Sequence, residues 1–159
     1  MPDLVIRNGR VEPDTFEILP ADAVDQKKGL TPILSLARWK ERGGSAVWLG
    51  PADDPAELAA AVGTLEIVAV HFPKFTDGRG YSIGALLRTR HGFKGELRAF
   101  GDVGRDQLFY LRRCGFDAFR LADHRDPHDA LASLADFTVR YQASVDDPVP
   151  LFRKRRAAA

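Results

Sequence analysis

The sequence predicts an α/β fold in which a mainly parallel sheet of four to five strands is built from strand-then-helix repeats. Short apolar runs typical of buried strands alternate with amphipathic segments at intervals of roughly 20 to 30 residues, which favours right-handed crossovers. The chain has 159 residues and a hydrophobic share of 45%, enough for one core. A doubly wound sheet and a partial (β/α) barrel both satisfy this pattern.

The first elements differ from the repeats that follow. Residues 4–11 read as a β-hairpin, because Asn8-Gly9 supplies the positive φ angles that a tight turn prefers. After a polar stretch, Thr31 and Pro32 predict the start of a helix, which Gly43 would end together with the glycine after it.

Four strand-then-helix units then follow. The predicted strands are residues 45–49, 66–72, 96–100 and 116–121. Helices are predicted at residues 55–62 and 106–113. A further helix has Ile83, Leu86 and Leu87 on one face and ends at Gly92. A long helix runs from Asp126-Pro127 through Val139. We expect residues 1–143 to form one α/β domain and residues 144–159, with the basic run 153–156, to form an extended carboxyl-terminal arm.

Composition excludes several classes of function. A formal net charge of +1 gives no field to attract nucleic acid or an acidic membrane. Apolar stretches are too short for a membrane span, and the first residues lack a basic-then-apolar leader, so we expect a cytoplasmic protein. The lone Cys114 excludes an internal disulfide and a Cys-x-x-Cys redox pair, and its apolar surroundings predict a buried thiol.

Candidate functional residues follow the strands, because ligands of parallel sheets bind at the carboxyl ends of the strands. The densest group lies in residues 71–82, where glycines on both sides of an arginine allow close backbone approach and two cations favour a small anion. A simple helix start, with Asp77 as its cap, explains the same residues equally well. The candidate proton-handling residues are His71, Asp77 and Asp102, and the candidate anion-binding residues are Lys74, Gly78, Arg79, Gly80 and Tyr81.

The sequence contains patterns of two other kinds of site. Gly78-x-Gly80-x-x-x-Gly84, with Asp102 about 20 residues later, distantly matches a nicotinamide dinucleotide fingerprint, but the glycine spacing is not the strict one. The cofactor therefore remains unknown. The acidic and histidine-rich residues 123–129 match a helix start better than a metal site, so we expect no metal.

Residues 71–82, 86–88, 95–99, 101–103, 106–107 and 113–116 together resemble an uncharacterised bacterial domain family whose members are labelled as oxidoreductases involved in sulfite reduction. The resemblance covers most of the chain, including 141–151. It implies a place in assimilatory sulfur metabolism, because members tend to be encoded beside sulfite reductase and the reductase for activated sulfate. It brings no catalytic residues with it.

The sequence is compatible with three functions. The first is an oxidoreductase or redox accessory of sulfite reduction that binds a small anion. The second is a non-catalytic partner that docks on sulfite reductase or its electron donor. A third alternative is a barrel-like lyase or isomerase fragment that a homodimer would complete.

Overall fold

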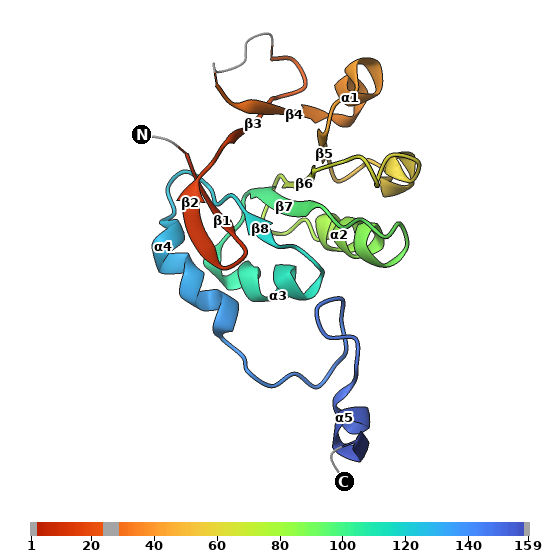
Figure 1. Ribbon diagram of the computed structural model, residues 1–159. Coiled ribbons are helices and arrows are strands. Elements are labelled where there is room, and N and C mark those ends of the chain that lie inside the picture. The colour runs from red at the N-terminus through yellow and green to blue at the C-terminus, as the bar shows by residue number, and fades with distance from the viewer. Residues whose placement is uncertain (1–2, 24–28, 158–159) are drawn as a thin grey trace.

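The computed structural model describes residues 3–23 and 29–157 and shows a mixed α/β fold around one eight-stranded sheet with the order β2-β1-β8-β7-β6-β5-β4-β3 (Figure 1). The strands are β1 Leu4–Arg7, β2 Arg10–Pro13, β3 Phe16–Ile18, β4 Thr31–Ser35, β5 Ala46–Leu49, β6 Ile67–Phe72, β7 Glu96–Gly101 and β8 Ala118–Phe119. The α-helices are α1 Leu36–Arg42, α2 Arg79–Thr89, α3 Leu108–Arg113, α4 Pro127–Ala130 and α5 Leu151–Ala157, and the 3-10 helices are η1 Pro55–Leu58, η2 Arg105–Gln107 and η3 Leu131–Ala135.

Strand order decides between the two predicted architectures. Strands β3 to β8 pair with one another in parallel and lie side by side in the order of the sequence. A doubly wound sheet would reverse its order at a switch point, so the partial-barrel alternative applies. The predicted number of four to five strands is too low, because the amino-terminal hairpin, β3 and β4 all join the same sheet.

The two edges of this sheet come close together where β2 leads into β3. Strands β2 and β3 lie at opposite ends of the strand order, yet only Asp14 and Thr15 connect them. In a flat sheet, seven inter-strand spacings would hold the edges about 34 Å apart, whereas this connection reaches about 11 Å. The sheet must therefore curl, and it forms a half-barrel with its helices outside the curl (Figure 1).

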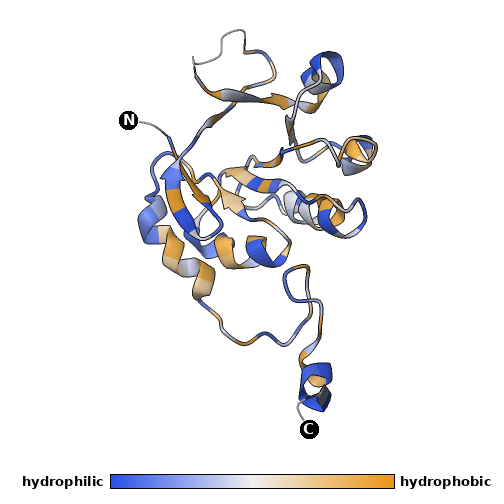
Figure 2. Ribbon diagram, in the orientation of Figure 1, coloured by the Kyte–Doolittle hydropathy of each residue, from blue (hydrophilic) through white to orange (hydrophobic). Residues whose placement is uncertain are grey.

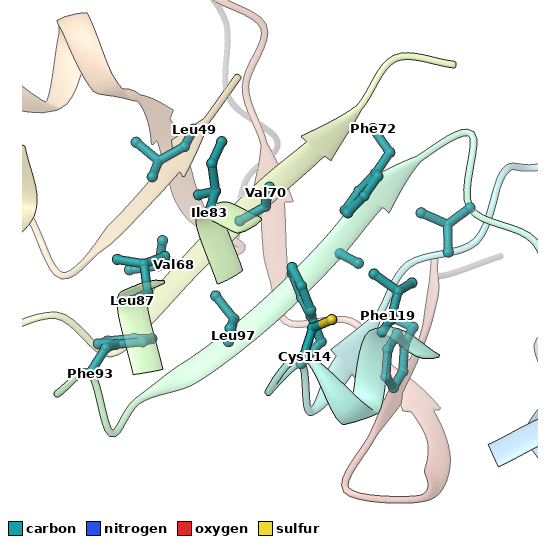
Figure 3. Packing of buried hydrophobic residues seen from close by; sticks show 14 of the residues in the cluster. Leu49, Val68, Val70, Phe72, Ile83, Leu87, Phe93, Leu97, Cys114 and Phe119 are labelled. Atoms are coloured by element: carbon teal, nitrogen blue, oxygen red, sulfur yellow. The ribbon is translucent and has the colours of Figure 1, made fainter. Parts of the chain in front are cut away.

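The curl gives the sheet two different faces. Along β6, Val68, Val70 and Phe72 point to the helices and join the main core (Figure 3). Ile67 and Ala69 point the other way into a smaller apolar cluster. We call this inner, concave face the trough. Side chains alternate between the two faces as in any strand, so each inward position of a central strand contributes to the trough.

The predicted hairpin is confirmed. β1 and β2 pair antiparallel, and the turn between them has φ angles of 48° at Asn8 and 76° at Gly9, the left-handed conformation that this dipeptide adopts readily. β1 also pairs antiparallel with β8, which attaches the hairpin to the parallel part of the sheet.

The predicted helix from Thr31 is wrong, because residues 31–35 form β4 and the helix begins only at Leu36. Pro32 is tolerated because the pairing of β4 with β5 begins at Leu34, so the missing N–H of the proline costs no ladder hydrogen bond there. The predicted end is confirmed by Gly43, whose φ is 71°.

The other helix predictions need smaller corrections. The segment predicted as helix 55–62 contains only the short η1, which Asp54 caps by accepting a hydrogen bond from the Ala56 N–H at 2.9 Å. The last predicted helix breaks into α4 and η3 and ends before Val139, which is exposed. Leu86 was expected on the buried face of α2 but is 38% exposed.

The segment after η3 returns to the body of the protein before it leaves again. The Ser144 hydroxyl donates to the Arg113 carbonyl oxygen at 2.7 Å, and the Val145 N–H donates to the same oxygen at 3.1 Å. Beyond these contacts the chain ends in α5, a largely hydrophilic helix that projects away from the sheet (Figure 2). Within the described ranges, no helix has the length and apolar character needed to cross a membrane.

Candidate functional site

The β6–α2 loop holds the densest group of predicted site residues. Asp77 was predicted to cap α2, but the N-cap residue is Gly78. Asp77 lies one residue earlier, and its Oδ1 accepts the Arg79 backbone N–H at 3.2 Å. The same carboxylate binds the Arg79 guanidinium through Nε at 2.9 Å and Nη2 at 2.7 Å. Lys74 is exposed and makes no ion pair within the described part of the chain. The loop therefore presents an oriented arginine and a free lysine beside a helix amino terminus.

This arrangement fixes the charge of Asp77. Hydrogen bonds from the Arg79 side chain lower the pKa of Asp77 to about 2, with a smaller contribution from the charge of Lys74. A carboxylate that stays ionised to such low pH is a poor proton acceptor near neutrality. The geometry thus gives Asp77 a positioning role for Arg79 in place of the proton-handling role predicted from sequence.

The packing of α2 against the sheet explains why Gly80 and Tyr81 occupy their positions, whereas Gly78 has open space around it. A Cβ at Gly80 would lie 2.5 Å from the Phe72 ring, and one at Gly78 would meet nothing closer than 3.9 Å. The Tyr81 hydroxyl accepts a hydrogen bond from Gln107 Nε2 at 3.2 Å, and burial raises its pKa. Gly80 and Tyr81 therefore seat α2 on the sheet.

Asp102 connects three loops at the carboxyl edge. Its Oδ2 accepts the Phe75 backbone N–H at 3.0 Å, and its Oδ1 accepts a hydrogen bond from Arg125 Nη2 at 3.4 Å. We call this arrangement the Asp102 latch. It brings Asp102 next to the loop that carries Lys74, but both carboxylate oxygens are already engaged by the protein.

The dinucleotide alternative gains nothing from these contacts. The glycines of its pattern are explained by close approach of α2 to aromatic side chains, since a Cβ at Gly84 would lie 2.3 Å from the Phe116 ring. Asp102, the candidate ribose-binding acid, is held by the latch.

His71 faces the trough. Its ring stacks on Phe100 with centroids 4.8 Å apart, and Trp48 packs edge-on at 6.0 Å from His71. Burial lowers the pKa of His71, so its imidazole is neutral near pH 7. The structure therefore separates His71, on the inner face of the sheet, from the loop that carries Asp77 and Arg79.

A hollow opens at the carboxyl mouth of the trough, beside Phe100. It has a volume of about 330 Å³ and runs from Ile18 at the end of β3 to Arg120 after β8. Sequence reasoning missed both Phe100 and Arg120, because they lie within predicted strands and not in loops. The alternation of side chains along a strand could have found them, because it places Phe100 on the inner face of β7 and Arg120 on the same face just after β8. The lining residues are Ile18, Phe100, Gly101, Arg120, Leu121, Ala122 and Asp123.

The two remaining sequence candidates have structural explanations. Asp126 caps α4 by accepting the His128 N–H at 2.8 Å, as the helix-start interpretation predicted. Among the described residues no group of three or more His, Cys, Asp or Glu side chains is placed to hold a metal ion. Cys114 is buried, and desolvation raises its pKa.

Fold and site together define an α/β half-barrel with a curled, mostly parallel sheet, whose carboxyl edge carries an arginine–lysine loop and the mouth of the trough. The chain belongs to the family described as "Bacterial protein of unknown function (DUF934)", whose family model matches residues 46–152. That range begins at β5 and includes the arginine–lysine loop and every lining residue of the trough mouth except Ile18. No curated protein and no solved structure shows significant similarity to the chain.

Proposed function

We propose that this chain binds a small oxyanion at the β6–α2 loop and serves assimilatory sulfite reduction as an oxidoreductase or redox accessory. The observation that carries the binding proposal is the pair of cations on one loop: Arg79, fixed by Asp77 yet 61% exposed at its side chain, and the unpaired Lys74. The resemblance of residues 71–116 to the sulfite-reduction family supports the pathway.

The chemistry of this loop suits recognition of an anion. Asp77 engages Nε and Nη2 of Arg79, which leaves the Nη1 donors of the guanidinium for a ligand. An arginine held in place by a carboxylate loses less conformational entropy on binding than a free one. Lys74 adds a second charge, so the loop carries a net positive charge even though Asp77 is ionised.

Thermal unfolding with sulfite, sulfate, phosphate and nicotinamide cofactors tests the binding. A ligand at about ten times its Kd adds about 1.4 kcal/mol, which raises Tm by about 3 to 5 °C for a domain of this size. Arg79→Ala and Lys74→Ala should each abolish the rise. Arg90→Ala is the matched control, because Arg90 is an exposed arginine just after α2. No rise with any compound, or an equal rise in the loop variants, contradicts the proposal.

Growth of a deletion strain tests the pathway separately. Cells that lack the chain should grow normally on cysteine and slowly on sulfate. Wild-type protein should restore growth on sulfate, and Arg79→Ala should not. Equal growth on sulfate with and without the chain would contradict a role in sulfite reduction, but it would not contradict the proposed anion site.

A second candidate function is docking on sulfite reductase or its electron donor. Val139 and Tyr141 lie in an irregular segment, and their side chains are 72% and 83% exposed. Arg140, between them, packs the other way, with its guanidinium carbon 5.3 Å from the centre of the Phe109 ring. The apolar side chains of this segment thus point away from the body, and the basic α5 follows. Such a surface is typical of a contact site.

Binding to purified sulfite reductase components distinguishes this candidate. The full chain should bind them, whereas a chain that ends at Gln142 and the variant Val139→Ser/Tyr141→Ser should not. Equal binding by all three proteins would exclude the carboxyl-terminal segment as the contact site.

A further inference from the structure

The mouth of the trough offers a second binding site, separate from the β6–α2 loop. Two hollows, of about 330 Å³ and about 250 Å³, share the four residues 120–123. Both hollows are therefore lined by the segment that follows β8. This is the carboxyl end of a curled parallel sheet, the place where barrels of this general type hold small molecules.

Charges of both signs line this mouth. The Arg120 side chain is only 24% exposed, and its Nη2 donates to Asp3 Oδ2 at 3.1 Å. Asp123 is exposed and makes no ion pair or hydrogen bond within the described residues, although it lines both hollows. Arg125 lines the smaller hollow, but the latch pairs it with Asp102.

This balance disfavours a simple anion. Arg120 is already paired with Asp3, and the same lining carries Asp123, so its charges do not favour a ligand with negative charge alone. Arg120 has guanidinium N–H groups beyond the one bonded to Asp3, and these can donate hydrogen bonds to an acceptor on a ligand. A ligand that carries an acidic and a basic group satisfies both.

The rest of the lining includes apolar side chains that the protein holds in place. The Phe100 ring stacks on His71, and Trp48 packs edge-on against Phe100 with centroids 5.9 Å apart. The Trp48 Nε1–H donates to the Leu19 carbonyl oxygen at 2.8 Å, which ties this aromatic group to the end of β3. Ile18 completes this apolar lining. A lining held in this way is prepared for an apolar side chain.

We propose that the trough mouth binds a free α-amino acid. Its carboxylate lies on Arg120, its ammonium group lies on Asp123, and its side chain packs on Phe100 and Ile18. Each part of the ligand meets a complementary group of the hollow, whose volume suits a molecule of this size. The site shares no residue with the oxyanion loop, so either proposal stands if the other fails.

Isothermal titration calorimetry with the twenty proteinogenic L-amino acids, each tested singly, identifies the ligand. The best binder is then compared with its decarboxylated amine and with its deaminated acid, which keep the side chain and lose one charge. The amino acid should bind at least about tenfold more tightly than either. No binding by any amino acid up to about 10 mM overturns the proposal, and so does equal or tighter binding of the amine or of the acid.

Two substitutions locate the site. Arg120→Gln and Asp123→Asn should each weaken binding at least about tenfold. Arg10→Gln is the control, because Arg10 is exposed on β2, outside both hollows. Asp123→Asn removes no contact within the described residues, so it keeps the fold even where loss of the Arg120–Asp3 pair lowers stability. Unchanged binding in Asp123→Asn contradicts the assignment of the ammonium group.

Discussion

Gly84 shows how one missing side chain sets the distance between a helix and the sheet. A Cβ at this position would lie 2.3 Å from the ring of Phe116, which is buried. Alanine favours a helix by about 1 kcal/mol over glycine, but overpacking a core typically costs about 1–3 kcal/mol. We expect Gly84→Ala to lower the free energy of unfolding by about 1–2 kcal/mol in urea denaturation.

A matched glycine provides the control for this substitution. Gly63 has open space around its Cβ position and no positive φ, so Gly63→Ala should change stability by less than about 0.5 kcal/mol. If Gly84→Ala is as stable as the wild type, the close approach of α2 to Phe116 is not a constraint on the fold.

The Asp77–Arg79 pair makes a prediction about pH. The folded pKa of Asp77 is about 2, below its ordinary value of 3.8. The pair therefore stabilises the folded state above pH 3.8, and this contribution is lost as the pH falls toward 2. An NMR titration of the Asp77 carboxyl carbon should give a midpoint of about 2, and Arg79→Gln should return it toward 3.8. A midpoint unaffected by Arg79→Gln would show that another group holds the carboxylate.

Site residues could be predicted from sequence only where they lie in loops. The run from His71 to Tyr81 stands out by composition, and the helix-start interpretation of Asp77 describes its contacts well. The partners of these residues could not be predicted. Asp102 receives the Phe75 N–H across 27 positions of sequence, and Arg120 lies beside Phe100 because β8 pairs with β7.

At the scale of elements, β4 shows why a local pattern can mislead. Thr31-Pro32 fits the start of a helix as well as the start of a strand, since proline suits the first helical turn and the unpaired part of a strand equally. Ile33, Leu34 and Ser35 are all buried. A run buried on both faces is typical of a strand inside a parallel sheet, but this burial depends on β3 and β5, which lie elsewhere in the sequence.

The Asp102 latch should hold the β6–α2 loop in place. Asp102→Ala removes the acceptor of the Phe75 N–H, and a hydrogen bond worth about 1 kcal/mol protects an amide about fivefold. We expect amide hydrogen exchange at Phe75 to become at least about fivefold faster, with the rates in β7 unchanged.

Two further variants make this measurement specific. Asp102→Asn keeps an oxygen acceptor and should show a smaller increase in exchange at Phe75. Asp123→Ala removes a neighbouring carboxylate that has no partner within the described residues and should leave the rate as in the wild type. An unchanged rate in Asp102→Ala would mean that the loop is held by its own turn.

For the whole molecule, sequence reasoning predicted the repeated units and missed how the sheet closes. Each unit is local, so periodicity and turn residues show it. Closure rests on contacts between distant residues, such as the pairing of Ile6 with Phe119 and the ion pair of Arg98 with Asp14. The partial-barrel alternative was correct, but no local signal could decide for it against a doubly wound sheet.

The ion pair between Arg98 and Asp14 joins the centre of the sheet to the two-residue connection between its edges. Arg98 Nη1 donates to Asp14 Oδ2 at 2.8 Å, and both side chains are fully buried. The other Asp14 oxygen accepts the Phe16 N–H at 3.1 Å, so the same carboxylate fixes the start of β3. Arg98 Nε also donates to Glu96 Oε1 at 2.7 Å, so loss of Asp14 leaves Arg98 with one carboxylate partner. Loss of Arg98 leaves the Asp14 charge buried without a cation, which typically costs about 3–5 kcal/mol.

A double-mutant cycle of Arg98→Met and Asp14→Leu measures this closure. Arg98→Met should lose about 3–5 kcal/mol of stability in urea denaturation, because it leaves the buried Asp14 charge without a cation. Asp14→Leu should lose less than Arg98→Met, because Arg98 keeps its ion pair with Glu96. The double variant should lose at least about 2 kcal/mol less than the sum, since no charge is then left unpaired. The exposed pair Arg105–Asp129, at 3.2 Å, is the control and should show a coupling below about 1 kcal/mol. If the coupling of the buried pair is no larger than that of the exposed one, the curl of the sheet is maintained by its apolar core, and Asp14 serves only to turn the chain from β2 into β3.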